Sequence, residues 1–375
     1  MRIGLDARLA FYDKTGIGRY TRALLAHLTL VDAGENDYFL FCDQQPPPEA
    51  WQNPRSRIVP IYQKQRILWT NFSLPPLLKA NQIQLYHGVC NFELPLRKVC
   101  PSVVTLHDLV PLFFPRLVPK KHLVLFKALI RWVIQIADKI ITISHASKND
   151  ILARFGIPEE KVQVVYLAHE PRYGPIPDSQ KIQSVLEKYG LNGRYLLFTG
   201  VLEPKKNLDR LVEAFYLLKA RSKAWKELKL VLVGGKGWGY ENLSRRIERR
   251  GLQKEVIFAG YVPEEDLPYL YNGAELFVFP SIYEGFGLPV LEAMACGVPV
   301  VTSRSSSLPE IVGDAGKLVN PWEARDIAQG IEEVLTEPGL KRSLIEKGLN
   351  RARGFSWLRT AAETLAVYRS VYKGG

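Results

Sequence analysis

The sequence predicts an α/β protein of two domains, each built on a parallel sheet with helices packed beside it. Short apolar, β-rich runs alternate with longer helical patterns along the whole chain, which is typical of parallel α/β units. At 375 residues the chain is too long for one ordinary core and suits two domains of ~150–200 residues each. The segment Glu170–Asp178 has three prolines and a glycine, which disfavour helix and central strand. We therefore expect domains at residues 1–172 and 178–356.

The expected strands form one set in each half of the chain. They are Ile3–Ala7, Tyr38–Cys42, Gln84–Gly88, Ser102–His107, Lys139–Ser144 and Val162–Ala168, then Tyr195–Gly200, Leu228–Gly234, Val256–Gly260, Glu275–Pro280, Pro299–Thr302 and Lys317–Val319. Each set predicts a Rossmann-like domain, and such open sheets bind ligands beyond the carboxyl ends of their strands. Two facing domains bind a ligand best in the cleft between them. The residues that directly follow the strands are therefore the candidates for a functional site.

Composition excludes several classes of protein. Apolar residues make up 47% and charged residues 23%, which is ordinary globular usage rather than that of a disordered chain. No apolar run reaches the ~18 residues of a membrane span, and charged residues interrupt the first apolar stretch, which argues against a secretory leader. The four cysteines (Cys42, Cys90, Cys100 and Cys296) lack a C-x-x-C spacing, which argues against a zinc site or a disulfide framework. We expect buried thiols and a cytoplasmic location.

The positive charge gathers in the first half of the chain. The net charge is +12, and residues 1–175 hold 22 Lys and Arg against 14 Asp and Glu, whereas the remainder holds 28 against 24. A basic face can meet phosphates, nucleic acid or anionic lipid, or serve solubility alone. In the helix expected at residues 119–137, Lys120, Lys127, Arg131 and Gln135 recur at steps of three and four among apolar residues. Such a helix either packs on the core with a solvated stripe or lies on a membrane surface, and both interpretations stay open.

Two segments that follow strands of the first half are candidates for ligand contacts. Gly16 and Gly18 lie in a strand-to-helix turn, where backbone amides can approach a phosphate at a helix N-terminus. A tight turn without a ligand is the alternative. His107 ends the expected strand Ser102–His107, where it can donate to a sugar hydroxyl or carry a proton near neutral pH. A structural histidine with satisfied hydrogen bonds is the alternative there.

Two segments of the second half point to a diphosphate and to hydroxyl groups. Lys205 and Lys206 follow a strand and the Gly200 turn and precede a helix, a placement that suits a diphosphate better than packing. Before the segment Ser281–Val300 a strand ends near Pro280; a glycine-rich turn follows, and a helix begins at Leu288. The free amides of that turn form an anion site. Glu284 on the turn and Glu292 on the helix can each accept hydrogen bonds from hydroxyl groups.

The segment Glu284–Glu292 resembles the E-x7-E signature of retaining glycosyltransferase family 4, also called group 1, which has the GT-B fold. The similarity extends over nearly the whole chain, in Asp6–Arg8, Gly16–Thr21, Leu202–Leu208 and Phe258–Val262. These motifs resemble the branch of bacterial mannosyltransferases that builds polysaccharides and lipid-linked glycans. The end of the chain, about residues 357–375, resembles the C-terminal helix that packs back on the first domain in this fold.

The resemblance implies transfer of a sugar from a nucleotide diphosphate donor to a glycan or lipid-linked acceptor, and the expected sugar is mannose from GDP-mannose. It implies retention of the anomeric configuration, an N-terminal acceptor domain and a C-terminal donor domain. It also assigns one contact with the donor to each candidate residue. Lys206 and Lys205 would neutralise the diphosphate, Gly16 and Gly18 would close over the phosphates, Glu292 would bind the ribose, Glu284 and the amides of Phe286, Gly287 and Leu288 would hold the sugar, His107 would lie near the sugar, and the backbone near Val262 would meet the base.

Several expectations concern cofactors and partners. The chain contains no D-x-D, so lysines and a helix N-terminus can replace a divalent metal, and we expect neither a metal nor a cofactor besides the GDP- or UDP-linked donor. No residue is an evident sugar nucleophile, which favours same-face substitution guided by the leaving phosphate. The expected partners are the donor and the acceptor, without nucleic acid. Peripheral contact with an anionic membrane, at its inner face, stays open.

The sequence leaves other functions as alternatives. A phosphorylase or a sugar-nucleotide epimerase of the same fold would share these motifs. An NAD-dependent dehydrogenase is suggested by Leu232–Gly239, but its glycines read G-x-G-x-G and no acidic residue ends a strand ~20 residues later. A basic nucleic-acid-binding module would account for the net charge but not for Glu284 and Glu292.

Overall fold

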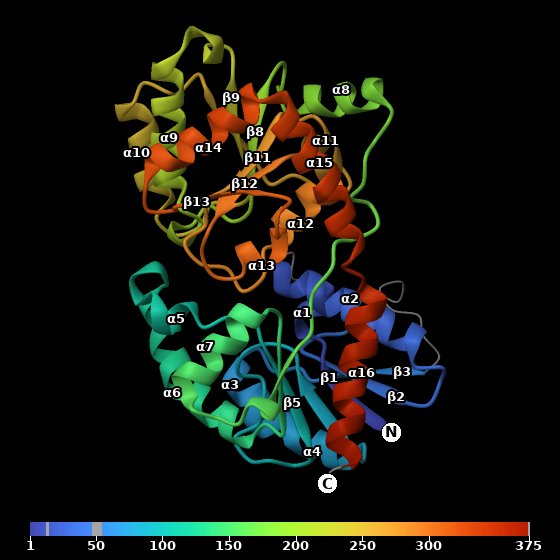
Figure 1. Ribbon diagram of the computed structural model, residues 1–375. Helices are drawn as coiled ribbons and strands as arrows, with labels where there is room; N and C mark the ends of the chain where they lie inside the picture. The colour runs from blue at the N-terminus through green and yellow to red at the C-terminus, as the bar shows by residue number, and fades with distance from the viewer. Residues whose placement is uncertain (13–14, 47–54, 374–375) are drawn as a thin grey trace. The chain divides into compact units, whose positions relative to one another are not determined.

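The computed structural model describes residues 1–12, 15–46 and 55–373 (Figure 1). It divides the chain into two compact units, Met1–Leu167 with Ser356–Gly375, and Ala168–Phe355. The change of unit at Leu167 comes just before the proline-rich segment Glu170–Asp178. The chain therefore leaves the first unit once and returns to it for its last helix.

The first unit is built on a parallel sheet of seven strands in the order β3-β2-β1-β4-β5-β6-β7. The strands are β1 (Arg2–Asp6), β2 (Asp37–Cys42), β3 (Ser56–Pro60), β4 (Leu85–Gly88), β5 (Ser102–Leu106), β6 (Lys139–Thr142) and β7 (Val162–Val164). Strand β3 was not expected, because as a half-buried edge strand it lacks the continuous apolar run of a central strand. Strand β7, the other edge, ends at Val164, before the expected Ala168.

The helices of the first unit cover this sheet. They are α1 (Arg8–Tyr12), α2 (Gly16–Val31), α3 (Arg66–Leu68), α4 (Leu74–Ala80), α5 (Val110–Phe113), α6 (Lys120–Ile136), α7 (His145–Phe155) and α16 (Trp357–Lys373). Helix α6, expected at residues 119–137, turns Phe126, Ile130 and Val133 into a core shared with the sheet. Helix α16 comes from the far end of the chain and lies along α2 (Figure 1).

The second unit is built on a parallel sheet of six strands in the order β10-β9-β8-β11-β12-β13. The strands are β8 (Tyr195–Thr199), β9 (Lys229–Val233), β10 (Val256–Gly260), β11 (Leu276–Phe279), β12 (Val300–Ser303) and β13 (Lys317–Val319). The helices are α8 (Ser179–Lys188), α9 (Leu208–Arg221), α10 (Tyr240–Arg249), α11 (Leu267–Asn272), α12 (Leu288–Ala295), α13 (Leu308–Val312), α14 (Ala324–Thr336) and α15 (Pro338–Arg353). Central strands β8 and β11 are wholly buried, as their continuous apolar runs require.

Glycine is needed where the loops after β8 and β9 meet. Gly234 follows β9 with φ +141°, and a Cβ built there would lie 2.0 Å from the carbonyl oxygen of Gly200, which follows β8. Any side chain would separate the two loops. Because these loops leave the carboxyl edge of the sheet, the glycines bring backbone together at the edge where open sheets bind ligands.

Candidate active site

An ion pair joins two of the expected residues at the carboxyl edge of the second unit's sheet. Lys206 ends a short 3-10 helix, Pro204–Lys206, after β8, and Glu284 lies on the turn between β11 and α12. The Lys206 Nζ donates to Glu284 Oε1 at 2.6 Å, and the two side chains are only 11% and 10% exposed. Burial acts to raise the pKa of Glu284, but the charges of Lys206 and Lys205 prevail and lower it. Glu284 is therefore a carboxylate at neutral pH.

Two serines fix the turn that carries Glu284. The Glu284 amide donates to Ser306 Oγ at 2.9 Å, and the Ser307 hydroxyl lies 2.9 Å from the carbonyl oxygen of Glu284 and 2.8 Å from that of Phe286. These hydrogen bonds determine the path of the backbone from Glu284 to Phe286. Neither serine was predicted from the sequence, because both lie in a loop after β12 that has no motif of its own.

Helix α12 begins at this turn. Gly287 is its N-cap with φ +112°, and a Cβ there would lie 2.8 Å from Leu308 Cδ2, so glycine is required. The amides of Val290 and Leu291 turn back to the Gly287 carbonyl, at 3.0 and 3.3 Å. Within the described ranges, no protein acceptor is found for the amides of Gly287 and Leu288. A helix start with free amides attracts an anion.

Glu292 lies on α12 and is almost completely buried, with 2% exposure. Its Oε2 accepts a hydrogen bond from the Tyr271 hydroxyl at 2.9 Å, and the Tyr271 oxygen lies 2.7 Å from Thr199 Oγ1. Burial and the charge of Glu292 raise the pKa of Tyr271 well above its usual value, so the phenol keeps its proton. Tyr271 was missed because nothing in α11 distinguishes it from a core residue.

Lys205 and Val262 occupy different parts of the same sheet edge. Lys205 Nζ lies 3.5 Å from Glu203 Oε1, and the Lys205 carbonyl accepts a hydrogen bond from the Ile282 amide at 2.9 Å. This backbone bond ties the 3-10 helix to the turn that carries Glu284. Val262 is buried and follows β10, two strands away from β8 in the sheet. Among the described residues, no hydrogen bond joins Val262 to Lys205, Lys206, Glu284 or Glu292, so its contact with a base stays a prediction.

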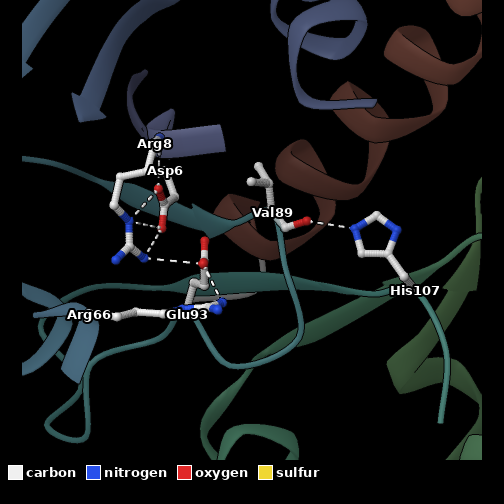
Figure 2. Close-up of polar contacts among 6 residues, drawn as sticks. All are labelled: Asp6, Arg8, Arg66, Val89, Glu93 and His107. Atoms are coloured by element: carbon white, nitrogen blue, oxygen red, sulfur yellow. Dashed lines mark hydrogen bonds and ion pairs between the residues drawn. The ribbon is translucent and has the colours of Figure 1, made fainter. Parts of the chain in front are cut away.

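His107 directly follows β5 in the first unit and is held in one orientation. Its Nε2 lies 2.9 Å from the Val89 carbonyl oxygen (Figure 2), and its backbone amide donates to Asn91 Oδ1 at 3.0 Å. Burial lowers the pKa of His107, so the imidazole is neutral near pH 7. Because a carbonyl only accepts hydrogen bonds, the proton of the neutral ring is on Nε2. Tyr20 packs its ring against the imidazole at a centroid distance of 5.1 Å.

Gly16 and Gly18 lie in the first turn of α2, which begins directly after Thr15. Gly18 is buried and Gly16 is exposed. Both glycines are therefore helical residues at a helix start rather than members of an open loop. Their contact with donor phosphates stays a prediction.

A cluster of charged side chains lies at the carboxyl edge of the first unit's sheet, near His107 (Figure 2). Asp6, Arg8 and Glu93 are buried, whereas the Arg66 side chain is 43% exposed. Arg8 on α1 makes paired hydrogen bonds to Asp6, which ends β1, with Nε 3.0 Å from Oδ1 and Nη2 2.6 Å from Oδ2. Glu93 Oε1 accepts a hydrogen bond from Arg66 Nη2 at 2.5 Å and lies 3.2 Å from Arg8 Nη2. Glu93 and Arg66 were not among the expected site residues, although a glutamate in the mostly apolar segment Val89–Leu94 was a usable signal.

Family models match both units of the chain. The model described as Glycosyl transferases group 1 matches residues 181–351, and the one described as Glycosyltransferase Family 4 matches residues 14–171. The chain is 34% identical over 373 residues to the O-antigen chain mannosyltransferase B of Escherichia coli, with 96% of this chain and 97% of that protein covered. The chain belongs to the group 1 family of glycosyltransferases. The resemblance carried by Glu284–Glu292 is thus confirmed.

Other comparisons support the fold of this glycosyltransferase. It is 35% identical over 227 residues to the serotype-specific mannosyltransferase WbdA of Escherichia coli, a match that covers 60% of this chain and 28% of that protein. It resembles the structure of sucrose-phosphate synthase from Thermosynechococcus elongatus with a TM-score of 0.79 and 20% identity, with both chains covered completely. For WaaG, a glycosyltransferase involved in lipopolysaccharide biosynthesis, the TM-score is 0.74 at 18% identity over 98% and 99% of the two chains. The expected α/β class and GT-B fold are confirmed.

Proposed function

We propose that this glycosyltransferase transfers mannose from GDP-mannose to a glycan or lipid-linked acceptor, with retention and without a divalent metal. Mannose as the sugar is supported by relatives that carry mannosyltransferase in their names, one of them matched over nearly its whole length. The observation that carries the donor site is the Lys206–Glu284 ion pair beside the free amides of Gly287 and Leu288. Cation, carboxylate and helix start together supply what a sugar diphosphate needs.

The proposed chemistry assigns a separate task to each group. When the bond between the anomeric carbon and the diphosphate oxygen breaks, negative charge grows on the diphosphate, and Lys206 with the amides of Gly287 and Leu288 stabilises it. Glu284, ionised and fixed by Ser306 and Ser307, accepts hydrogen bonds from the sugar hydroxyls. Glu292 accepts them from the ribose. Retention follows when the acceptor hydroxyl attacks on the face that the phosphate leaves, with the phosphate oxygen taking the acceptor proton.

The absence of D-x-D from the sequence supports the metal-independent form of this proposal. Lys205 and Lys206 supply positive charge where a divalent ion would otherwise bridge the phosphates. The co-substrate is then the nucleotide sugar alone, and no further cofactor is proposed.

The test is a reaction of the purified protein with GDP-mannose and a mannose-containing acceptor, in excess EDTA and in Mg²⁺. We expect equal rates of mannosyl transfer in both, and an α-linked product by the one-bond C1–H1 coupling in NMR, since the donor is α-linked. Loss of activity in EDTA that Mg²⁺ restores would overturn metal independence. A β-linked product would overturn retention. Parallel reactions with UDP-linked sugars identify the base and the sugar, and phosphate-dependent release of mannose 1-phosphate would identify a phosphorylase instead.

We also propose that α6 brings the enzyme to an anionic membrane surface. Helix α6 contains no acidic residue, and Val124 on its outer face is 68% exposed. A hollow of about 250 Å³ beside it has an apolar wall and a cationic rim; its lining residues are Leu112, Lys127, Ile130, Arg131, Arg154 and Phe155. Within the described ranges, the three cations of this rim have no ion-pair or hydrogen-bond partner. Charge of one sign beside exposed apolar side chains fits a lipid surface with anionic headgroups.

The cellular location belongs to the same proposal. Among the helices that the structure describes, none is long and apolar enough to cross a bilayer. The four cysteines are free thiols. We place the enzyme in the cytoplasm, at the inner face of the membrane when α6 is bound.

A further inference from the structure

The segment from Val89 to Glu93, directly after β4, supplies both hydrogen-bond acceptors that hold His107. The Val89 carbonyl accepts from Nε2, and the Asn91 side chain accepts from the backbone amide of His107. The segment also packs closely against the end of its own strand, since a Cβ on Gly88 would lie 2.6 Å from the Glu93 carbonyl oxygen. The position of this segment therefore determines the position and the tautomer of His107.

Glu93, itself buried, anchors the far end of this segment in the charge cluster of Asp6, Arg8, Arg66 and Glu93 (Figure 2). The residue is 1% exposed, and its Oε1 receives both arginines, Arg66 at 2.5 Å and Arg8 at 3.2 Å. Arg8 is itself fixed by its paired contact with Asp6 and by the Trp69 ring, whose centroid lies 3.8 Å from the guanidinium carbon. One carboxyl oxygen thus joins the segment to two other elements. Arg8 links it to Asp6 at the end of β1, and Arg66 links it to helix α3.

The free nitrogen of His107 shows what this anchoring achieves. With its proton on Nε2, the neutral ring presents a lone pair on Nδ1, and no partner for Nδ1 is found among the described residues. A lone pair at the carboxyl edge of the sheet can accept a hydrogen bond from a hydroxyl group. If the Val89 carbonyl moved away, the proton would redistribute between the two nitrogens and Nδ1 would become a donor in part of the molecules.

We infer that Glu93 is a positioning residue for the transfer reaction, which keeps the Val89–Glu93 segment in place so that His107 presents Nδ1 as an acceptor to a sugar hydroxyl. The inference rests on the proposed function and on the place near the donor sugar that the family resemblance implies for His107. It assigns a function to Glu93 Oε1 as the acceptor of the Arg66 hydrogen bond and as the oxygen that contacts Arg8, not to the charge of the carboxyl group. Substitution can therefore separate the effect of the Glu93 acceptor oxygen from the effect of its charge.

The experiment compares Glu93→Leu, which removes the acceptor, with Glu93→Gln, which keeps a carbonyl oxygen for both arginines. We expect Glu93→Leu to lower kcat about tenfold to a hundredfold, as for a misplaced reacting group, with little change in the donor KM. Glu93→Gln should stay near the wild-type kcat. Glu35→Leu is the matched control, because Glu35 belongs to the same unit and pairs with Arg369 at the surface, outside the cluster.

The second readout is the tautomer of His107, from ¹⁵N NMR of the imidazole in the full-length protein, with the signal assigned through His107→Gln. We expect the Nε2–H form in the wild type, Glu93→Gln and Glu35→Leu, and a mixture in Glu93→Leu. An unchanged His107 signal in Glu93→Leu overturns the inference, even if kcat and stability fall, because Glu93 would then be merely structural.

A second pair of variants covers the case in which Glu93→Leu does not fold. Asn91→Ala removes the acceptor of the His107 amide, and Asn91→Asp keeps an oxygen there. We expect a lower kcat and a displaced His107 signal in the first, and recovery of both in the second. An equal kcat and an equal His107 signal in the two variants overturn the inference, because the Val89–Glu93 segment would then not hold His107. A wild-type kcat in His107→Gln would instead refute the proposed role of His107, whatever the NMR of the Glu93 variants shows.

Discussion

Lys206 Nζ lies 2.6 Å from Glu284 Oε1, and the ring centroid of Phe279 lies 4.9 Å from the same nitrogen. A nucleotide diphosphate brings at least two negative charges to this site. The Lys206 side chain has one carboxylate partner, and its remaining N–H groups can donate to the phosphates. The lysine ammonium group has three N–H donors, enough for Glu284 and for phosphate oxygens together. Holding this cation in place before the reaction avoids the cost of organising it during the reaction.

We expect Lys206→Ala to lower kcat by about 30-fold to 1,000-fold, the equivalent of ~2–4 kcal/mol of transition-state stabilisation from a charge-assisted contact. The substitution also leaves Glu284 without its partner, so the melting temperature should fall. Steady-state kinetics with a saturating acceptor measure the effect. Lys188→Ala, at an exposed lysine of the same unit, is the control. Wild-type turnover in folded Lys206→Ala would refute the donor site.

Glu284 and Glu292 should differ in their kinetic effects. Glu284 is placed against the sugar, which gains positive charge in the transition state, so Glu284→Gln should lower kcat. Glu292 is placed against the ribose, which does not change charge, so Glu292→Gln should raise the donor KM. Donor saturation curves of the two variants give kcat and the donor KM for each of them. The reverse result would exchange the two roles, and normal kinetics in both would end this interpretation of the motif.

Stability should fall as the pH rises through the range in which Glu93 ionises. Burial and the Asp6 carboxylate raise the pKa of Glu93 from 4.5 to about 8, against the opposing charges of Arg8 and Arg66. Because the folded protein holds this proton more tightly than the unfolded chain, the contribution is complete below about pH 4.5 and is lost as the pH passes about 8. Urea unfolding from about pH 6 to about pH 9 should show a steeper loss in the wild type than in Glu93→Gln. An equal dependence of the unfolding free energy on pH in the two proteins would contradict this prediction.

Among the elements, α6 offers the clearest test. Each cation near an anionic surface contributes about 1 kcal/mol, so replacing Lys120, Lys127 and Arg131 with glutamine should weaken binding to vesicles about a hundredfold at low salt. Cosedimentation with phosphatidylglycerol–phosphatidylcholine vesicles measures this, with pure phosphatidylcholine as the uncharged comparison.

The matched control for α6 removes surface charge from the other unit. Arg245→Gln with Arg249→Gln takes two positive charges from α10 without touching α6. This variant should bind the vesicles as the wild type does. If both variants lose binding in proportion to the charge removed, net charge accounts for the effect and α6 is not the contact.

The elements and the site were predictable to different degrees, for physical reasons. Central strands such as β8 and β11 are buried on both faces, so their apolar runs stand out, whereas edge strand β3 contains Arg57 and was missed. The turn from Glu284 to α12 was predictable because its glycines and proline are local requirements. The contacts of Glu93 and Tyr271 were not predictable, because their partners lie on other elements that only the tertiary fold brings together.

At the scale of the whole molecule, the last helix is part of the first unit's core. Tyr368 on α16 is completely buried, and its hydroxyl lies 2.6 Å from Nδ1 of His87 on β4. Tyr368→Phe leaves that nitrogen without a partner and should cost about 1–3 kcal/mol of unfolding free energy. Tyr372→Phe is the control, since that hydroxyl is exposed and makes a 3.3 Å contact with Gln84. Urea denaturation, monitored by hydrogen exchange at the amides of β4, measures the unfolding free energy of the two variants. Equal losses of unfolding free energy would refute the structural role of the Tyr368–His87 hydrogen bond.

The contact between Tyr368 and His87 spans 281 residues and therefore has a consequence during synthesis on the ribosome. Strand β4 is made early, but the helix that completes its surroundings is translated only after the entire second unit. The second unit is contiguous and can finish folding first, although its residues come later than most of the first unit. Until then the face of the first unit that α16 covers is open, with apolar side chains exposed, as is typical of nascent chains that chaperones bind. The first unit can therefore be completed only after the second unit has been synthesised.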